Sequence, residues 1–371
     1  MRAKVDFWST GLRGDMVQLP LVEAVAQDNN IEQRIVSSAL GPSRVRFEET
    51  GLPFVATPGN RRLLSAPFTL AQIARCRADL RNWYAHHKPI VHVTMASPWD
   101  QFYLDVPKRC GAKILLTIHD AVQHIGEENR LMVVLENRLI RLADHVAVLS
   151  NYAGERMAER IGKLRPVHVI SPGLVMDNSI PGPAKVVPRD RPIKFLFFGR
   201  IRDYKGLDFV LEAWRRIKSL DNLPMQLTIA GSGDIDKYLP AVRKLPDIEL
   251  LHGWVSDETM AQIFAAHDVN LLPYREGSSS ATSLAGMWVG MPTIASPIGG
   301  FKEQLIANVN ALIMNDISAS SLAECMLELA SSPELYTKLA KGAHNQAIAL
   351  SAPVVAQNWR NLYEQLSFPQ H

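Results

Sequence analysis

Residues 194–219 read KFLFFGRIRDYKGLDFVLEAWRRIKS and contain a complete strand–turn–helix unit. The apolar run Lys194–Phe198 predicts a buried strand, and the helical spacing of apolar residues in Leu207–Ser219 predicts a helix. Between them lies a glycine turn, residues 199–206, which carries three cations: Arg200, Arg202 and Lys205. A turn of this kind between a buried strand and a helix is typical of a parallel α/β sheet.

The alternation of short apolar runs with helical patterns extends in both directions from this unit. Upstream, strands are expected at Lys4–Ser9, Ile90–Thr94, Lys113–Ile118, His145–Leu149 and Pro166–Ile170, and helices at Val17–Gln27, Thr69–His86, Arg130–Leu142 and Tyr152–Gly162. Downstream, strands are expected at Gln226–Ala230, Glu249–Leu251, Val269–Leu272 and Thr293–Ala295, and helices at Ile235–Lys244, Asp257–Ala266, Ala281–Val289 and in two C-terminal segments. Because strands alternate with helices throughout, the predicted fold class is α/β with parallel sheets.

Length and a proline-rich segment divide this pattern into two domains. A chain of 371 residues is long enough for two domains of about 150 residues each. Ser171–Pro192 holds five prolines and few apolar residues, which indicates a linker. We therefore expect two doubly wound, Rossmann-like domains, one over residues 1–178 and one over residues 190–352.

The composition excludes several classes of protein. Hydrophobic residues make up 47% of the chain and charged residues 21%, which is ordinary for a globular protein. The formal net charge of +3 is too small to indicate nucleic acid as a partner. The three cysteines lie far apart and form no Cys-x-x-Cys pair, so we expect neither a disulfide framework nor a zinc site, and a reducing, cytoplasmic location.

The sequence predicts neither a secretion signal nor a membrane span. Met1–Trp8 lacks a long apolar run. The uncharged stretch Gly277–Phe301 is long enough to cross a bilayer, but its glycines and prolines favour a buried helix followed by a buried strand. Seven arginines fall between Arg44 and Arg81, where they could contact an anionic membrane or a phosphorylated acceptor, or form an ordinary solvated helix face. We therefore expect a soluble protein and leave peripheral contact with the inner face of the cell membrane open.

Two loops that follow predicted strands contain residues suited to binding an anion. In open parallel sheets, ligands bind beyond the carboxyl ends of the strands. The first loop is the cationic turn with Arg200 and Lys205, and the second runs from Pro273 through small residues to Thr282, where a helix is expected to begin. Free N–H groups at a helix N-terminus attract phosphate, and two cations would neutralise the same anion. The pair of loops therefore predicts a diphosphate site.

A histidine at the end of a strand is a further candidate. The strand Lys113–Ile118 is followed by His119 and Asp120, a pair that could orient or polarise a substrate hydroxyl. A structural hydrogen bond is the commoner role of a strand-end histidine. Asp234–Asp236 matches the Asp-x-Asp metal motif in form, but it stands at a predicted helix start, where aspartate is a favoured cap, so no metal is expected.

Several motifs together resemble the retaining glycosyltransferases of family four, which have the GT-B fold. The resemblance covers residues 190–352 and, more loosely, the N-terminal half. Its motifs are Phe198-Gly199-Arg200 with Tyr204-Lys205-Gly206, Ile229-Ala230-Gly231-Ser232-Gly233, His252-Gly253-Trp254-Val255-Ser256, Gly290-Met291-Pro292-Thr293-Ile294-Ala295, Gly299-Gly300 and Thr117-Ile118-His119-Asp120. The GT-B fold implies a cleft between the two domains and a last helix, residues 354–371, that returns to the N-terminal domain.

The resemblance also implies roles for individual residues. Arg200 and Lys205 would bind the donor diphosphate and stabilise the leaving nucleotide, and His119 would lie beside the donor sugar. The Gly299–Gly300 turn lies near the donor sugar in such folds. The remaining donor contacts would come from two glycine loops and from the segment that reads the nucleobase: Gly14, Gly199, Trp254 and Val255.

The chain departs from the family pattern in the loop that precedes residue 281. The family usually has two glutamates eight positions apart, but here the second place is Ala285 and the first is Gly277. Glu276 either takes the first place after a slip of one residue or faces solvent. A subgroup of the family has a serine-rich loop instead, whose hydroxyl and N–H groups would hold the diphosphate or sugar: Ser278, Ser279, Ser280, Ala281 and Thr282. The departure leaves the identity of the donor open more than the class of reaction.

These features predict a retaining glycosyltransferase that moves a hexosyl unit from a UDP- or GDP-sugar to a glycan or lipid-linked glycan in surface polysaccharide biosynthesis. No metal or other cofactor is expected. Two alternatives remain open. A nucleotide-sugar epimerase of the same fold would convert the donor without an acceptor, and a non-catalytic scaffold would bind sugar nucleotides without turnover.

Overall fold

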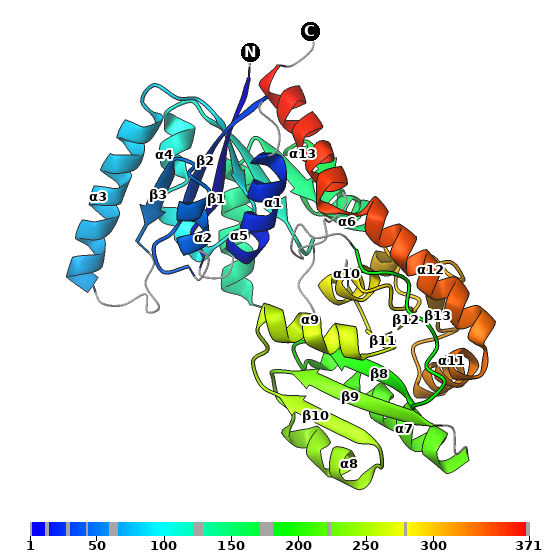
Figure 1. Ribbon diagram of the computed structural model, residues 1–371. Coiled ribbons are helices and arrows are strands. Elements are labelled where there is room, and N and C mark those ends of the chain that lie inside the picture. The colour runs from blue at the N-terminus through cyan, green and yellow to red at the C-terminus, as the bar shows by residue number, and fades with distance from the viewer. Residues whose placement is uncertain are drawn as a thin grey trace. The chain divides into compact units, whose positions relative to one another are not determined.

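The computed structural model describes residues 2–11, 15–26, 30–41, 44–58, 66–121, 129–170, 181–220, 224–277 and 280–368, without the side chains of residues 15–17, 66–69 and 257 (Figure 1). The chain forms two compact units. Residues 1–122, 129–178 and 352–371 make up the first unit, and residues 179–351 make up most of the second.

The first unit is built on a parallel seven-stranded sheet with the order β3-β2-β1-β4-β5-β6-β7. Its strands are β1 (Ala3–Ser9), β2 (Ile31–Ser38), β3 (Phe54–Thr57), β4 (Ile90–Val93), β5 (Lys113–Ile118), β6 (His145–Val148) and β7 (Val167–Val169). Its helices are α1 (Asp15–Ala26), α2 (Arg44–Glu49), α3 (Ala66–Tyr84), the 3₁₀ helix η1 (Pro98–Phe102), α4 (Asp105–Arg109), α5 (Arg130–Leu142), α6 (Asn151–Ile161) and α13 (Ala352–Ser367).

The second unit is built on a parallel six-stranded sheet with the order β10-β9-β8-β11-β12-β13. Its strands are β8 (Ile193–Phe198), β9 (Met225–Gly231), β10 (Ile248–His252), β11 (Val269–Leu272), β12 (Thr293–Ala295) and β13 (Ala311–Ile313). Its helices are η2 (Asp203–Lys205), α7 (Leu207–Leu220), η3 (Asp236–Tyr238), α8 (Leu239–Lys244), α9 (Asp257–Ala266), α10 (Ala281–Trp288), η4 (Gly299–Phe301), α11 (Ala319–Ser331) and α12 (Pro333–Ala349).

The predicted α/β class with two doubly wound sheets is confirmed. β8 and β11 are nearly continuous apolar runs because central strands of a parallel sheet are covered on both faces. The uncharged stretch 277–301 forms the buried helix α10 and the buried strand β12, as predicted. Among the described residues, no helix combines the length and hydropathy needed to span a bilayer.

The structure has elements that the sequence patterns did not predict: β2, β3, β13, α2 and α4. The C-terminal region also folds into three helices where two were expected. The strands β3 and β13 have only four and three residues, too few for a periodic pattern. β2 carries Glu32, Gln33 and Arg34 in its first half, so its sequence lacks an apolar run.

The described part of the predicted linker, from Pro181 on, packs against the second unit. The Gly182 N–H donates to the Trp288 carbonyl at 2.7 Å, and the Lys185 N–H donates to the Gly290 carbonyl at 3.0 Å. The Lys185 ammonium also donates to the carbonyls of Ala265 and His267. These bonds explain why the second unit starts before residue 190, the boundary that the prolines suggested.

The last helix, α13, belongs to the first unit, where it lies beside α1 and contacts β1 (Figure 1). Its buried face includes Trp359 and Tyr363. The Tyr363 hydroxyl lies 2.7 Å from Nδ1 of His92 in β4, and the Trp359 ring lies 4.5 Å from the His92 ring, centroid to centroid. α13 therefore contributes directly to the core of the first unit.

Candidate functional site

The carboxyl end of β8 turns at Gly199, which has a φ of +116°. This backbone conformation favours glycine. A Cβ at Gly199 would lie 2.8 Å from Lys205 Nζ and 3.8 Å from Thr282 Oγ1. The turn after β8 therefore brings the Lys205 ammonium close to Thr282 in the first turn of α10.

Lys205 is a buried cation, with 9% of its surface exposed. Its ammonium lies 4.9 Å from the centroid of the Tyr274 ring, and among the described residues it makes no ion pair with a carboxylate. A buried ammonium without a carboxylate partner is costly unless an anion binds it. The Lys205 environment thus favours an anionic ligand.

The N-terminus of α10 is capped by Ser280. The Ser280 hydroxyl accepts from the Ser283 N–H at 3.3 Å, and the Ser280 N–H donates to Gln304 Oε1 at 2.9 Å. The N–H groups of Ala281 and Thr282 lie in the first helical turn, where a helix supplies them no acceptor. Two of the predicted N–H donors are therefore available to an anion, whereas the Ser280 N–H is already used within the protein.

Arg275 joins the loop after β11 to the loop after β8, a role that sequence reasoning missed. Its N–H donates to the Tyr204 carbonyl at 2.7 Å, and its guanidinium donates to both carboxylate oxygens of Asp208 and to the Asp203 carbonyl. The hydrogen bonds with Asp208 raise the pKa of Arg275 above its ordinary value. This clamp fixes the segment that carries Lys205.

The other predicted residues of the second unit are placed as follows. Arg200 is exposed after β8, and Glu276 is half-buried in the loop after β11. Trp254 follows β10 with 69% of its surface exposed, and Val255 next to it is half-buried. Three predicted donor contacts lie outside the described residues: Gly14, Ser278 and Ser279.

In the first unit, His119 follows the carboxyl end of β5 and is half-buried. Its Nε2 lies 2.8 Å from the Thr94 carbonyl oxygen. Since a carbonyl only accepts hydrogen bonds, Nε2 carries the proton of this contact. The structure thus gives His119 the structural hydrogen bond that the sequence analysis considered for a histidine at the end of a strand.

A second histidine, His92 in β4, is buried in the core of the first unit. Its Nδ1 faces the Tyr363 hydroxyl, and its Nε2 lies 2.8 Å from the Thr117 hydroxyl. Burial, together with the nearby His119, lowers the pKa of His92 to about 3. His92 therefore stays neutral at physiological pH and serves the packing of α13.

The predicted basic surface between Arg44 and Arg81 is partly neutralised. Three of its arginines form ion pairs: Arg44 with Glu48, Arg46 with Glu23 and Arg77 with Asp105. Arg61 and Arg62 lie outside the described residues. The described part of this run therefore offers fewer unpaired cations than the sequence suggested.

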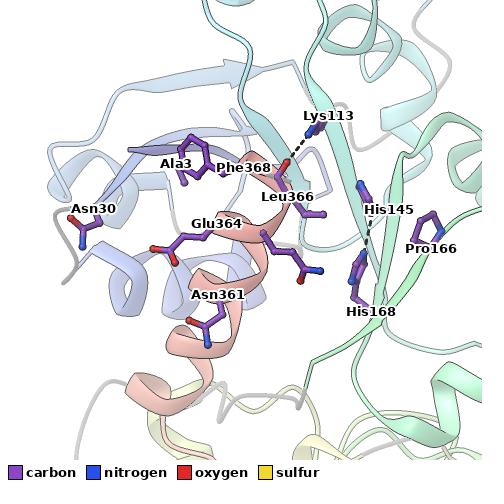
Figure 2. Close-up of a pocket in the computed structure, with 11 residues that line it drawn as sticks. Ala3, Asn30, Lys113, His145, Pro166, His168, Asn361, Glu364, Leu366 and Phe368 are labelled. Atoms are coloured by element: carbon purple, nitrogen blue, oxygen red, sulfur yellow. Dashed lines mark hydrogen bonds between the residues drawn. The ribbon is translucent and has the colours of Figure 1, made fainter. Parts of the chain in front are cut away.

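A cavity of about 1020 Å³ lies at the amino ends of the strands of the first sheet (Figure 2). His145 Nδ1 and His168 Nε2 lie 3.1 Å apart on its wall, and the Lys113 ammonium donates to the Leu366 carbonyl at 2.6 Å. Burial lowers the pKa of both histidines. The cavity lies at the amino ends of the strands, whereas His119 lies at their carboxyl ends. No predicted site residue lines the cavity. Within the described residues, no group of acidic, histidine or cysteine side chains is arranged to hold a metal ion.

Comparisons with known proteins found two family models that match this chain. The family model "Glycosyl transferases group 1" matches residues 192–332, and the model "Glycosyltransferase Family 4" matches residues 21–178. Two curated relatives are D-inositol 3-phosphate glycosyltransferases, from Xylanimonas cellulosilytica at 24% identity over 57% of this chain and from Saccharomonospora viridis at 25% over 65%. The matches span 54% and 61% of these relatives' own lengths. A third, the amylovoran biosynthesis glycosyltransferase AmsK of Erwinia amylovora, is 28% identical over 38% of this chain and 36% of its own length.

Solved structures share the fold over nearly the whole chain. Sucrose-phosphate synthase from Thermosynechococcus elongatus has a TM-score of 0.75 at 17% identity and covers 99% of both chains. Anabaena HepE in complex with UDP-glucose has a TM-score of 0.72 at 15% identity and covers 98% of this chain and 99% of its own. At this identity the likeness shows the GT-B fold.

Proposed function

Because the chain belongs to glycosyltransferase family four, whose two domain models match residues 21–178 and 192–332, we propose that it is a retaining glycosyltransferase. In the proposed reaction, a hexosyl unit moves from a nucleotide diphosphate sugar to a hydroxyl group on a glycan or lipid-linked glycan. The proposal includes no metal ion or other cofactor.

The observation that carries this proposal is the arrangement around Gly199. Lys205, a buried cation with no carboxylate partner within the described ranges, lies there beside the first turn of α10. As the bond between the sugar and the diphosphate breaks, the leaving nucleotide gains negative charge. A preorganised ammonium and two N–H groups stabilise that charge more strongly in the transition state than in the ground state. We assign Arg200 to the same diphosphate, as the family resemblance implies.

The proposed chemistry uses no nucleophile from the protein. The bond between the anomeric carbon and the diphosphate oxygen breaks while the acceptor hydroxyl attacks the same face of the sugar. The proton of that hydroxyl passes to the departing phosphate oxygen, so the configuration is retained and the charges balance. We assign His119 to a place beside the donor sugar, as the family resemblance implies.

The donor and the setting are also part of the proposal. A structural neighbour, HepE, is described in complex with UDP and with UDP-glucose, and this supports a UDP-sugar. The relative named for amylovoran biosynthesis supports a role in polysaccharide assembly. For peripheral contact with an anionic membrane we propose α5, which exposes Leu131 and Val134 beside Arg138.

Nucleoside diphosphates are expected to stabilise the chain in a thermal-shift panel of UDP, GDP, ADP and dTDP with their sugars. A ligand at 100 times its Kd adds about 2.7 kcal/mol to the free energy of unfolding, which is a measurable rise in Tm. The rise should be the same with EDTA present, since the proposed site binds the diphosphate through the protein alone. The absence of any shift, or a shift that requires a divalent metal, would contradict the proposal.

Replacing Arg275 with methionine is expected to lower kcat/KM for the donor about three- to tenfold, because the clamp on the Lys205 segment is lost. Its effect on the free energy of unfolding should stay near 1 kcal/mol, since the pair with Asp208 is partly exposed. Steady-state kinetics and thermal unfolding measure the two effects. Arg215→Met removes a similar ion pair, with Glu212 on the exposed face of α7, and is the matched control that should leave kcat/KM unchanged. Equal kinetics in both variants would rule out the clamp.

A further inference from the structure

Gln304 lies under the N-terminus of α10, 24 residues along the chain from Ser280. Its Oε1 accepts from the Ser280 N–H at 2.9 Å and lies 3.0 Å from the Ser283 hydroxyl. The Gln304 carbonyl accepts from Asn310 Nδ2 at 2.9 Å, which fixes the backbone that carries the side chain. The backbone of Gln304 and the oxygen of its side-chain amide are therefore both held in place.

These contacts assign the oxygen and the nitrogen of the Gln304 side-chain amide. A backbone N–H can only donate, so the atom that faces the Ser280 N–H is the oxygen, and Nε2 is its neighbour on the same carbon. Gln304 has 3% of its surface exposed, and its Nε2 is buried without a hydrogen-bond partner in the part of the chain that the structure describes. An unsatisfied buried N–H₂ group is costly to keep.

The position of the unpartnered Nε2 indicates a role in ligand binding. Nε2 is bonded to the same carbon as Oε1, which accepts from the N–H of the α10 N-cap, Ser280. The N–H groups of Ala281 and Thr282 follow this N-cap in the first turn of α10. Gln304 also follows the Gly299–Phe301 turn by three residues along the chain. The Oε1 contacts explain why an apolar side chain does not stand here, but they do not explain the unpaired Nε2, which is better explained by an acceptor that arrives with a ligand.

We propose that Gln304 is a specificity-determining residue of the donor site, whose Oε1 holds the N-cap of α10 while its Nε2 donates to an oxygen of the bound sugar nucleotide. This inference rests on the proposed function. Both a phosphate oxygen and a sugar hydroxyl provide the required acceptor. A phosphate oxygen would accept from Nε2 in both the nucleoside diphosphate and the sugar nucleotide. A sugar hydroxyl would accept only in the sugar nucleotide.

Gln304→Glu separates the two halves of the amide. Glutamate keeps an acceptor for Ser280 and Ser283, removes the Nε2 donor and adds one negative charge. The full chain is titrated calorimetrically with UDP and UDP-glucose, or with GDP and GDP-mannose, whichever pair stabilises the unsubstituted protein. Lys302→Gln changes the net charge by the same one unit at an exposed position two residues away, and is the matched control.

The expected result is a loss of affinity of about tenfold in Gln304→Glu and less than twofold in Lys302→Gln. A loss for both UDP and UDP-glucose assigns the contact to a phosphate oxygen, and a loss for UDP-glucose alone assigns it to a sugar hydroxyl. Gln304→Met, which introduces no charge, should weaken binding as well, and it serves where Gln304→Glu does not fold.

Two results would overturn the inference while leaving the proposed function intact. One is binding by the Gln304 variants within twofold of the unsubstituted chain. The other is an equal loss in Lys302→Gln, which would show that net charge alone is responsible. If the unsubstituted chain binds neither nucleotide pair, the proposed function itself fails.

Discussion

Replacing Lys205 with alanine is expected to slow sugar transfer by more than tenfold and to leave the fold intact. The ammonium of Lys205 is buried beside Gly199 and the first turn of α10, where the leaving diphosphate is proposed to bind. One charge-assisted hydrogen bond is worth about 1.5–3 kcal/mol, and 1.36 kcal/mol corresponds to a factor of ten in rate. Because the contact strengthens as the nucleotide leaves, kcat should fall and not only the affinity for the donor.

Kinetics and thermal unfolding of the same variant test this expectation. The Tm without ligand should stay constant or rise, because alanine removes a buried cation that has no carboxylate partner among the described residues. Lys244→Ala, an exposed position on α8, is the control and should change neither quantity. If Lys205→Ala transfers sugar at the unsubstituted rate, the diphosphate site has been assigned to the wrong residues.

The central part of the second unit could be predicted because its signals are local. The strand β8, the glycine turn and the helix α7 follow one another within 28 residues, and each has its own pattern. The burial of Lys205 beside Gly199 also follows from this order, since the turn must close over the end of the strand. The short strands β3 and β13 have no such pattern, and they exist because neighbouring strands offer them hydrogen-bonding partners.

The residues that support the site could not be predicted for a related reason. Arg275 binds Asp208 across 67 positions of the chain, and Gln304 binds Ser280 across 24. Neither partner is marked by a motif, because an arginine before a glutamate or a glutamine after one is common in any surface loop. Only the fold, which brings the two loops to one edge of the sheet, shows that these side chains act on the site.

The first unit depends on a buried ion pair whose loss is expected to destabilise it strongly. Asp6 in β1 is fully buried, and both its carboxylate oxygens accept from Arg34 in β2, at 2.8 and 2.7 Å. Trp83 of α3 donates to the same carboxylate at 3.0 Å, and its ring lies 4.1 Å from the Arg34 guanidinium carbon. Arg34→Met would leave this carboxylate buried without its cation, a change that costs about 3–5 kcal/mol.

Hydrogen exchange measures the loss of stability in Arg34→Met separately for each segment of the chain. Peptides that cover β1 and β2 should exchange faster in Arg34→Met, by a factor that corresponds to the lost free energy of opening, while peptides that cover β8 and β9 should be unchanged. The double variant Asp6→Asn/Arg34→Met removes both charges and should recover part of the loss, because no buried charge is then left unpaired. Equal exchange in the single variant and the unsubstituted chain would show that the pair contributes little to stability.

The same pair predicts how the stability of the first unit depends on pH. Burial alone would raise the pKa of Asp6, but the His87 ring, whose Nε2 lies 3.5 Å from the carboxylate, and the hydrogen bonds from Arg34 and Trp83 outweigh it and hold the pKa below its ordinary value of 3.8. Above pH 3.8 the carboxylate is charged in both the folded and the unfolded chain, so its full contribution is present. As the pH falls from 3.8 through the lower folded pKa, the unfolded chain takes up the proton first, and this contribution is lost. In Arg34→Met the cation is gone and burial favours the protonated carboxyl, so the difference in stability between the unsubstituted chain and this variant should be largest near neutral pH and shrink as the pH falls. A difference that grows on acidification would contradict the assignment.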